Sequence, residues 1–192
     1  MMRNGVDVEK LGGMVEAVKR DPSLAALKFS MHSEWRGGLR AQHSGGAYTV
    51  GTTTTKHRSP RSIVTDEPPE ILGSDAGVSP AEMTLASLAA CLMVGYSANA
   101  AAMGIDLEEV TLDLVGDGDL QGFMNIGSKR PGLSKISVSA RVLAKNATPQ
   151  KLKELHDYVN EHSPIWDTIA NPVRVESKLV DGGQPQQARA IS

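Results

Sequence analysis

The most reactive side chain of the sequence is Cys91, the only cysteine among 192 residues. A thiol becomes a nucleophile as its thiolate, and its pKa must fall from about 8.5 through a nearby cation or a helix N-terminus. Cys91 lies about twelve residues after Ser79, the expected start of its helix, which is too far for the helix dipole to act. A reactive Cys91 therefore needs a nearby arginine. The preceding region offers Arg36, Arg40, Arg58 and Arg61.

A second interpretation of Cys91 is purely structural. It closes the stretch SPAEMTLASLAAC, whose alanines indicate a buried helix. Cysteine is a common small residue inside such helices. The residues alone leave both interpretations open.

Other candidate groups have structural explanations. Glu82 falls three residues after Ser79, as in a capping box, and lies ~13.5 Å along a straight helix from Cys91. His162 beside Ser163 suggests a hydrolase, although adjacent helical side chains diverge and no nucleophile elbow is present. The five histidines lack zinc-ligand spacing, and no phosphate loop or dinucleotide fingerprint occurs. We expect neither a metal nor a cofactor.

The composition indicates one domain with appendages. The net charge of −2 gives no electrostatic footprint for nucleic acid or an anionic membrane. A lone cysteine suits a reducing compartment, and the N-terminal segment lacks the apolar core of a signal peptide. We therefore expect a cytoplasmic protein.

The uncharged stretch between Glu82 and Asp106 is long enough to be tested as a membrane span. It is mostly alanine and carries several polar residues, whereas efficient insertion depends on Leu, Ile, Phe and Val. We interpret it as a helix buried in protein. Ser79 as N-cap, Pro80 at the first helical position and Gly104 at the C′ position predict its ends. Apolar on nearly all sides, it should be the central core helix.

The remaining elements predict an α+β fold. Apolar spacing over 6–19 indicates an amphipathic N-terminal helix that docks on the body. Residues 24–65 predict an antiparallel meander of three or four strands, separated by Gly37-Gly38, Gly45-Gly46 and KHRSPR, followed by a loop over 66–80. After the central helix we expect the following elements: a strand from 108, a long hairpin loop, a strand over 133–144, a helix opened by Thr148-Pro149 with Ile165 on its apolar stripe, a strand over 173–180, and a polar tail.

Three segments resemble the OsmC/Ohr family (osmotically inducible and organic hydroperoxide resistance proteins). They are IVTDEPPEILGSDAGVSPAEMTLASLAACL, VNEHSPIWDTIANPVRVES and WRGGLR. The resemblance spans roughly residues 27–180 and implies an OsmC-like domain over 24–181, with a helical appendage over 1–23 and a tail over 182–192. It further implies an intertwined homodimer around two central helices, and thiol-dependent reduction of organic hydroperoxides.

The resemblance also assigns roles. Cys91 occupies the peroxidatic position, and WRGGLR corresponds to the region that supplies the assisting arginine, which favours Arg36 or Arg40. Two positions depart from the family pattern: Ser163 stands where typical members have the second cysteine, and Ala81 stands where they have a glutamate.

Without a second cysteine, a sulfenic acid on Cys91 must be reduced by an external thiol. We therefore predict a single-cysteine, OsmC-like peroxidase acting on organic hydroperoxides, with apolar walls around Cys91 that suit alkyl or lipid peroxides. The alternative is a non-enzymatic OsmC-like stress protein that binds an apolar small molecule in the dimer cleft. No nucleic acid or membrane partner is expected.

Overall fold

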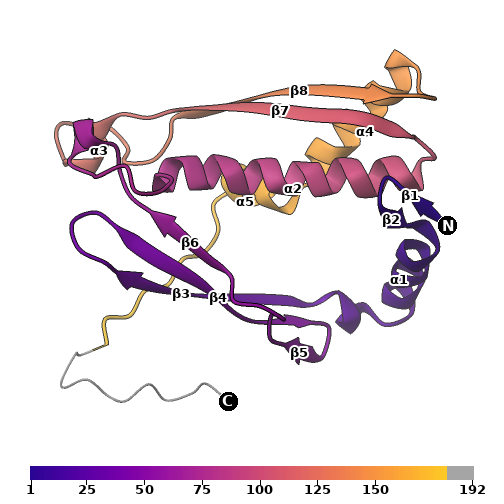
Figure 1. Cartoon of the computed structure of the whole chain (residues 1–192), viewed down its shortest axis with the longest axis horizontal. Coiled ribbons are helices and arrows are strands. Elements are labelled where there is room, and N and C mark those ends of the chain that lie inside the picture. Colours follow the sequence, from indigo (N-terminus) through magenta and orange to yellow (C-terminus); the bar gives the residue numbers. More distant parts are fainter. Residues whose placement is uncertain (181–192) are drawn as a thin grey trace.

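A long helix, α2, lies between two antiparallel sheets (Figure 1). The computed structural model describes residues 1–180. Its strands are β1 (Met2–Arg3), β2 (Val6–Asp7), β3 (Leu27–Trp35), β4 (Ala41–Val50), β5 (Thr53–Thr55), β6 (Ser62–Thr65), β7 (Leu107–Asp117) and β8 (Lys135–Ala144). Its α-helices are α1 (Val8–Arg20), α2 (Pro80–Ala102), α3 (Leu120–Phe123), α4 (Pro149–Glu161) and α5 (Pro164–Ala170), with short 3₁₀ turns η1 (Pro22–Ala25) and η2 (Pro69–Ile71). The predicted α+β class is confirmed.

Both predicted ends of α2 are confirmed. The Ser79 side chain accepts from the Glu82 backbone N–H, and the Glu82 carboxylate accepts from the Ser79 backbone N–H. At the other end Gly104 has a φ of +76°, and the Ile105 N–H donates to the Ala100 carbonyl. This Schellman arrangement satisfies carbonyls that the helix leaves unpaired and turns the chain into β7.

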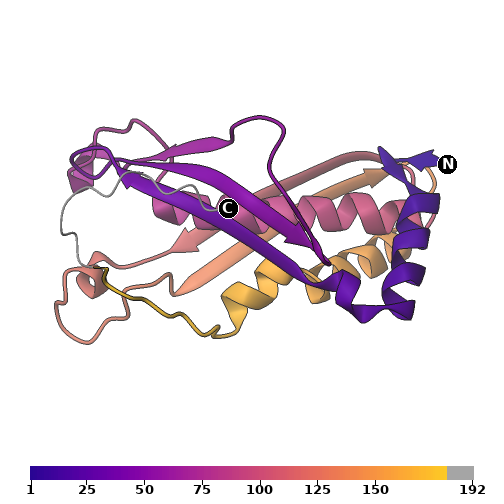
Figure 2. The same cartoon turned by 90° about the horizontal axis from the view of Figure 1, so that it is seen from below.

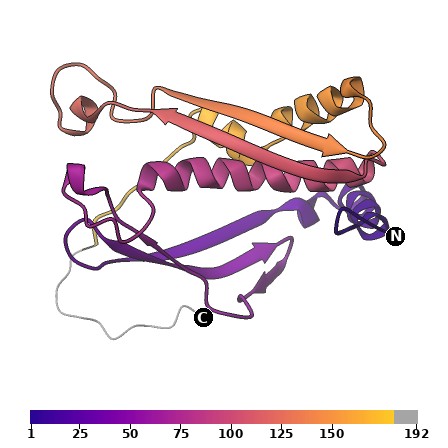
Figure 3. The same ribbon diagram turned by 45° about the horizontal axis from the view of Figure 1, so that its top comes forward.

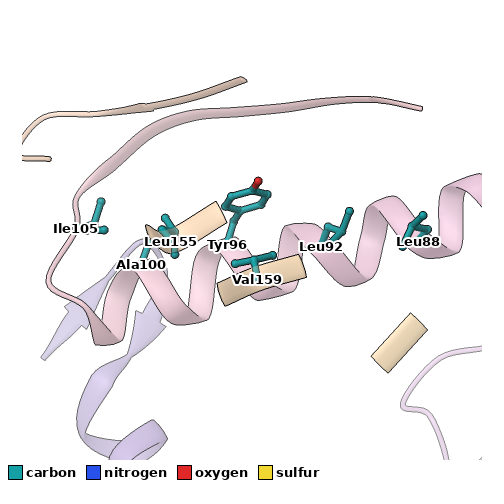
Figure 4. Close-up of a cluster of buried hydrophobic side chains, with 7 residues drawn as sticks. All are labelled: Leu88, Leu92, Tyr96, Ala100, Ile105, Leu155 and Val159. Atoms are coloured by element: carbon teal, nitrogen blue, oxygen red, sulfur yellow. The ribbon is translucent and has the colours of Figure 1, made fainter. Parts of the chain in front are cut away.

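The core lies between α2, α4 and the β7–β8 sheet (Figure 4). Its seven buried members are Leu88, Leu92, Tyr96, Ala100, Ile105, Leu155 and Val159. Four of them recur along α2 at four-residue steps, so they share one side of the helix. Alternate residues of β7 and β8 pack against this cluster, as the period-two pattern of both strands predicts.

The opposite side of α2 is open in the single chain, where Val94 is 69% exposed. The prediction of a long, apolar helix at the centre of the fold is confirmed, but only one side of it is covered. By length and composition, α2 is the helix among residues 1–180 that could cross a membrane. Core helices of soluble proteins pass the same test, and α2 packs on β7, α4 and α5.

The β3–β6 sheet forms the second layer (Figure 2). Four strands are present, as predicted, but Gly45-Gly46 does not separate two of them. β4 continues through both glycines, and its register with β3 shifts between Phe29 and Met31. A Cβ at Gly46 would lie 2.4 Å from the Ser30 hydroxyl, so this glycine permits close strand approach rather than a turn.

The boundaries of two helices differ from the prediction. The N-terminal helix starts at Val8, because residues 2–7 form a hairpin whose Asn4 and Gly5 both have positive φ, as tight β-hairpin turns require. This hairpin docks at the C-terminal end of α2 (Figure 3), where Arg3 pairs with Asp106 at 3.0 Å. Ile165 is not on α4, because α4 ends at Glu161 and α5 begins at Pro164.

One loop prediction and one strand prediction are corrected. The long β7–β8 loop contains the one-turn helix α3. The strand predicted over 173–180 is absent: the segment forms no strand, and Val175 and Leu179 are 84% and 96% exposed. A strand requires a neighbouring edge, and no segment of residues 1–180 pairs with this one. The predicted tail over 182–192 lies outside the described residues.

Candidate functional site

Cys91 and Ser163 are in contact, although 72 positions separate them in the sequence. The Ser163 hydroxyl donates to the Cys91 sulfur across 3.3 Å and accepts from the Trp166 backbone N–H across 3.3 Å. The N–H fills one acceptor site of the oxygen, and the hydroxyl hydrogen remains available for the bond to the sulfur. Ser163 is 5% exposed, and Cys91 is partly exposed.

This contact depends on how closely α4 and α5 approach α2. Ser163 is the N-cap of α5, and Pro164 follows at the first helical position. One turn beyond Cys91, a Cβ built on Gly95 would lie 2.9 Å from Cγ1 of Val159. Gly95 therefore permits α4 to lie close against α2, which sets the position of Ser163 beside Cys91.

Arg36 and Arg40 lie at the turn between β3 and β4. The Arg36 backbone N–H donates to the Arg40 carbonyl, and the Arg36 guanidinium pairs with Glu34 at 2.7 Å. Among residues 1–180, no hydrogen bond joins either arginine to Cys91. The single chain thus places Ser163 beside Cys91, but it brings neither Arg36 nor Arg40 to hydrogen-bonding distance of Cys91.

Glu82 has the structural role that its spacing predicted. Its carboxylate accepts from the Ser79 backbone N–H at 2.7 Å, and this hydrogen bond lowers the pKa of Glu82. The preceding Ala81, at the family's glutamate position, is exposed. No carboxylate from the start of α2 therefore serves Cys91.

The hydrolase hypothesis for His162 and Ser163 is wrong in this structure. His162 stacks on Tyr158 with ring centroids 4.0 Å apart, and its Nδ1 donates to the Tyr158 carbonyl. The Ser163 hydroxyl is directed to Cys91 instead. Within residues 1–180, no three His, Cys, Asp or Glu side chains gather where they could hold a metal ion.

A groove of about 970 Å³ opens beside the N-terminal half of α2. Its walls come from α2, from the β7–β8 hairpin and from α5, with Leu88, Ile136 and Trp166 among the apolar side chains. Leu88 lies about one helical turn before Cys91. The sequence did not reveal this groove, because its walls are far apart in the chain. The Ser-Pro pair at 163–164, which repeats the pair at 79–80, was the available signal that α5 is a separate helix.

Asp66 organises the loop that leads into α2. It is 1% exposed, and its carboxylate accepts from the backbone N–H groups of Glu67, Ser74 and Ala76 and from the Ser74 hydroxyl. These hydrogen bonds lower the pKa of Asp66 from 3.8 to about 2, and the bond from the Ser74 hydroxyl contributes most to that shift. Sequence reasoning missed this residue; an aspartate at the start of a Pro- and Gly-rich loop was the available signal.

The family model "OsmC-like protein" matches residues 73–178, more than half of the chain. The matched region includes α2, the β7–β8 hairpin, α4 and α5, and therefore both Cys91 and Ser163. The chain belongs to the OsmC-like family.

Solved structures share the fold. An OsmC-like protein from Mycoplasma pneumoniae is 18% identical with a TM-score of 0.56, covering 76% of this chain and 89% of its own. An OsmC-like protein of unknown function from Vibrio cholerae is 18% identical with a TM-score of 0.54, covering 73% and 92%. The organic hydroperoxide resistance protein OhrB of Bacillus subtilis also matches, at 18% identity and a TM-score of 0.44, covering 76% and 92%. No curated protein matches the chain.

Proposed function

We propose that the protein is a thiol-dependent peroxidase that reduces organic hydroperoxides through Cys91. The observation that carries the proposal is the 3.3 Å hydrogen bond from the Ser163 hydroxyl to the Cys91 sulfur. A donor directed at the sulfur stabilises a thiolate more than a thiol, because it bonds more strongly to the charged form. Cys91 is also partly exposed, as access by a substrate requires.

The chemistry balances with one cysteine. The thiolate attacks one peroxide oxygen, the O–O bond breaks, and the alkoxide takes up a proton and leaves as an alcohol. Cys91 is thereby oxidised to a sulfenic acid. A small thiol attacks this sulfur and releases water, and a second thiol reduces the mixed disulfide, so the reductant leaves oxidised. The external thiol is necessary because Ser163 cannot form a disulfide, and the reducing cytoplasm would supply it.

A homodimer is part of this proposal. The β3 strand is exposed along its whole length, and Phe29 and Trp35 are 71% and 77% exposed. Large apolar side chains exposed together along one strand are typical of a surface that another chain covers. A second copy that covers β3 and the open side of α2 could bring its own Arg36 or Arg40 to Cys91, where a guanidinium would stabilise the thiolate and orient the peroxide.

Peroxide consumption tests the proposal. Purified protein with dithiothreitol and cumene hydroperoxide should consume the peroxide. Cys91→Ser should abolish turnover, while His162→Ala, which leaves the Cys91 contact in place, should retain it. Equal rates for wild type and Cys91→Ser would refute the proposal.

The groove supports a second candidate, a non-enzymatic binding protein in which Cys91 only packs. A volume of about 970 Å³ is that of a small-molecule site, and Ala81 and Ser163 remove two catalytic groups of typical family members. This candidate predicts that the intact mass of the protein is unchanged by excess cumene hydroperoxide, because Cys91 stays unmodified. Rapid sulfenylation of Cys91 would rule it out.

A further inference from the structure

A polar network crosses the otherwise apolar core between α2 and α4. The Tyr96 hydroxyl forms a hydrogen bond with Nδ1 of His156 across 2.5 Å, and Nε2 of the same ring lies 3.0 Å from the amide nitrogen of Asn160. Tyr96 lies in the row of core side chains along α2, beside α4 (Figure 4). Of the seven buried members of that cluster, Tyr96 alone carries a polar side-chain atom. It is 1% exposed, so the network is complete without a second copy.

The network belongs to a series of contacts that leads to Cys91. Three pairs of residues join α2 to the α4–α5 segment, in opposite order along the two: Cys91 with Ser163, Gly95 with Val159, and Tyr96 with His156. Asn160 links the last pair to the first, because its side chain contacts the His156 ring and its carbonyl accepts from the Ser163 N–H at 3.5 Å. The seven residues from His156 to Ser163 correspond to about two helical turns. A displacement of His156 along α2 is therefore passed on to Ser163.

Apolar packing alone does not fix where α4 lies along α2. Hydrophobic contact is non-directional, and α2 presents small residues to α4, with Gly95 against Val159. A hydrogen bond is directional, and breaking it leaves a buried polar group unpaired at a cost. Burial raises the pKa of Tyr96 to about 12, which keeps the phenol protonated and able to donate. The Tyr96–His156 pair therefore selects one position of α4 among those that apolar contact permits.

We propose that Tyr96 and His156 are positioning residues of the Cys91 site, whose hydrogen bond sets the register of α4 on α2 and thereby holds the Ser163 hydroxyl against the Cys91 sulfur. Within residues 1–180 neither of the two residues hydrogen-bonds to Cys91, so their effect on the thiol passes through Ser163. The consequence for turnover rests on the proposed function. The consequence for thiol reactivity does not.

A double-mutant cycle tests the proposal without turnover. The rate of Cys91 alkylation by iodoacetamide at a fixed pH is measured in wild type, Tyr96→Phe, Ser163→Ala and the double variant. Tyr96→Phe alone should slow alkylation about fivefold, the size of effect that one hydrogen bond gives. In the Ser163→Ala background it should have no further effect, because both changes remove the same contact. An unchanged rate in Tyr96→Phe, or additive effects of the two changes, would overturn the proposal.

The matched control is Tyr158→Phe. Tyr158 lies on α4 and nearer to Ser163, its ring stacks on His162, and within residues 1–180 its hydroxyl forms no hydrogen bond. This variant should alkylate at the wild-type rate. A rate lowered as much as in Tyr96→Phe would overturn the assignment to Tyr96.

Two substitutions of His156 test the other partner of the bond. His156→Asn places an amide near the position of Nδ1 and should retain most of the alkylation rate. His156→Leu fills a similar volume without a polar atom and should slow alkylation as Tyr96→Phe does. Equal rates in the two variants would contradict a role for the hydrogen bond.

The Ser163→Cys background reports the geometry itself. The equilibrium of its disulfide with glutathione measures the effective concentration of the two thiols. Adding Tyr96→Phe should lower this effective concentration about fivefold, as the loss of one hydrogen bond gives, whereas adding Tyr158→Phe should leave it unchanged. An effective concentration unaffected by Tyr96→Phe would show that the bond does not position residue 163, against the proposal.

Turnover separates this proposal from the proposed function. With cumene hydroperoxide, Tyr96→Phe should lower kcat/KM by the same factor as the alkylation rate, since both depend on the reactivity of Cys91. Slowed alkylation in Tyr96→Phe, with no peroxide consumption even by wild type, would support the positioning role and refute the peroxidase. Peroxide consumption by wild type, with unchanged alkylation in Tyr96→Phe, would do the reverse.

Discussion

The two sheets of this protein share an antiparallel topology but differ in what covers them. The β7–β8 sheet packs on α2 and α4, and its inward side chains belong to the core cluster. The β3–β6 sheet leaves every residue of β3 exposed, including Phe29 and Trp35. The covered half contains the Cys91–Ser163 contact, whereas the uncovered half carries the arginines expected to assist it. One chain therefore builds the surroundings of Cys91, and in the proposed homodimer a second copy would add the arginine.

The largest contrast between the halves should appear in core truncations. Leu155→Ala, at a position that is 0% exposed, should lower the free energy of unfolding by about 2–5 kcal/mol, through lost burial and the cavity left behind. Phe29→Ala in β3 should cost no more than about 0.5 kcal/mol in a dilute, monomeric sample. Urea unfolding followed by circular dichroism measures both. A large loss for Phe29→Ala in the monomer would mean that the chain itself covers β3.

The approach of α4 to α2 can be tested at Gly95. Gly95→Ala places a Cβ 2.9 Å from Val159 and should cost about 1–3 kcal/mol by overpacking. Gly12→Ala, in the exposed helix α1 with no neighbour near the new Cβ, should instead stabilise by about 0.5–1 kcal/mol. Urea unfolding of both variants measures the difference. A neutral Gly95→Ala would contradict the close packing of the two helices.

Acid titration tests the hydrogen bonds that Asp66 makes in the loop before α2. The pKa of Asp66 is lowered to about 2 by hydrogen bonds. The resulting stability is fully present above 3.8, the ordinary pKa, and is lost as pH falls through about 2. Asp66→Asn should therefore reduce the fall in stability between these pH values, measured by urea unfolding. Asp75→Asn, exposed in the same loop, should leave that fall unchanged.

The smallest expected effect concerns the Ser163 hydrogen bond. Ser163→Ala removes the hydroxyl that donates to the Cys91 sulfur across 3.3 Å and should slow alkylation of Cys91 by iodoacetamide at a fixed pH. Ser163→Cys places a second thiol against Cys91 and should form a disulfide under mild oxidation, detected as the loss of both thiol hydrogens by intact mass. Failure to form that disulfide, together with an unchanged alkylation rate in Ser163→Ala, would refute the contact.

Local signals predicted the covered half well. Ser79, Glu82 and Gly104 delimited α2 because caps and C′ glycines act through their own backbone neighbours. The prediction of a break between strands at Gly46 was wrong, because this glycine is needed for the close approach of Ser30 on the neighbouring strand. The strand predicted over 173–180 was also wrong. Apolar alternation indicates that a segment can form a strand, but not whether a sheet edge is available to pair with it.

The candidate site was predicted only in part. Cys91 and Ser163 were singled out by type and family position, and the structure brings them together. The Arg36 and Arg40 assignments stay predictions. The groove beside α2 was missed because its walls come from segments far apart in the chain.

The sequence by itself determined the α+β class, the capped ends of α2, the identity of the nucleophile candidate and the absence of a second cysteine. These properties depend on residues within a few positions of one another or on composition. Only the tertiary structure decided that Ser163 touches Cys91, that Gly95 permits the helix approach behind that contact, and that an apolar groove opens beside α2. Such contacts join residues far apart in the chain, and packing in three dimensions decides which of them meet.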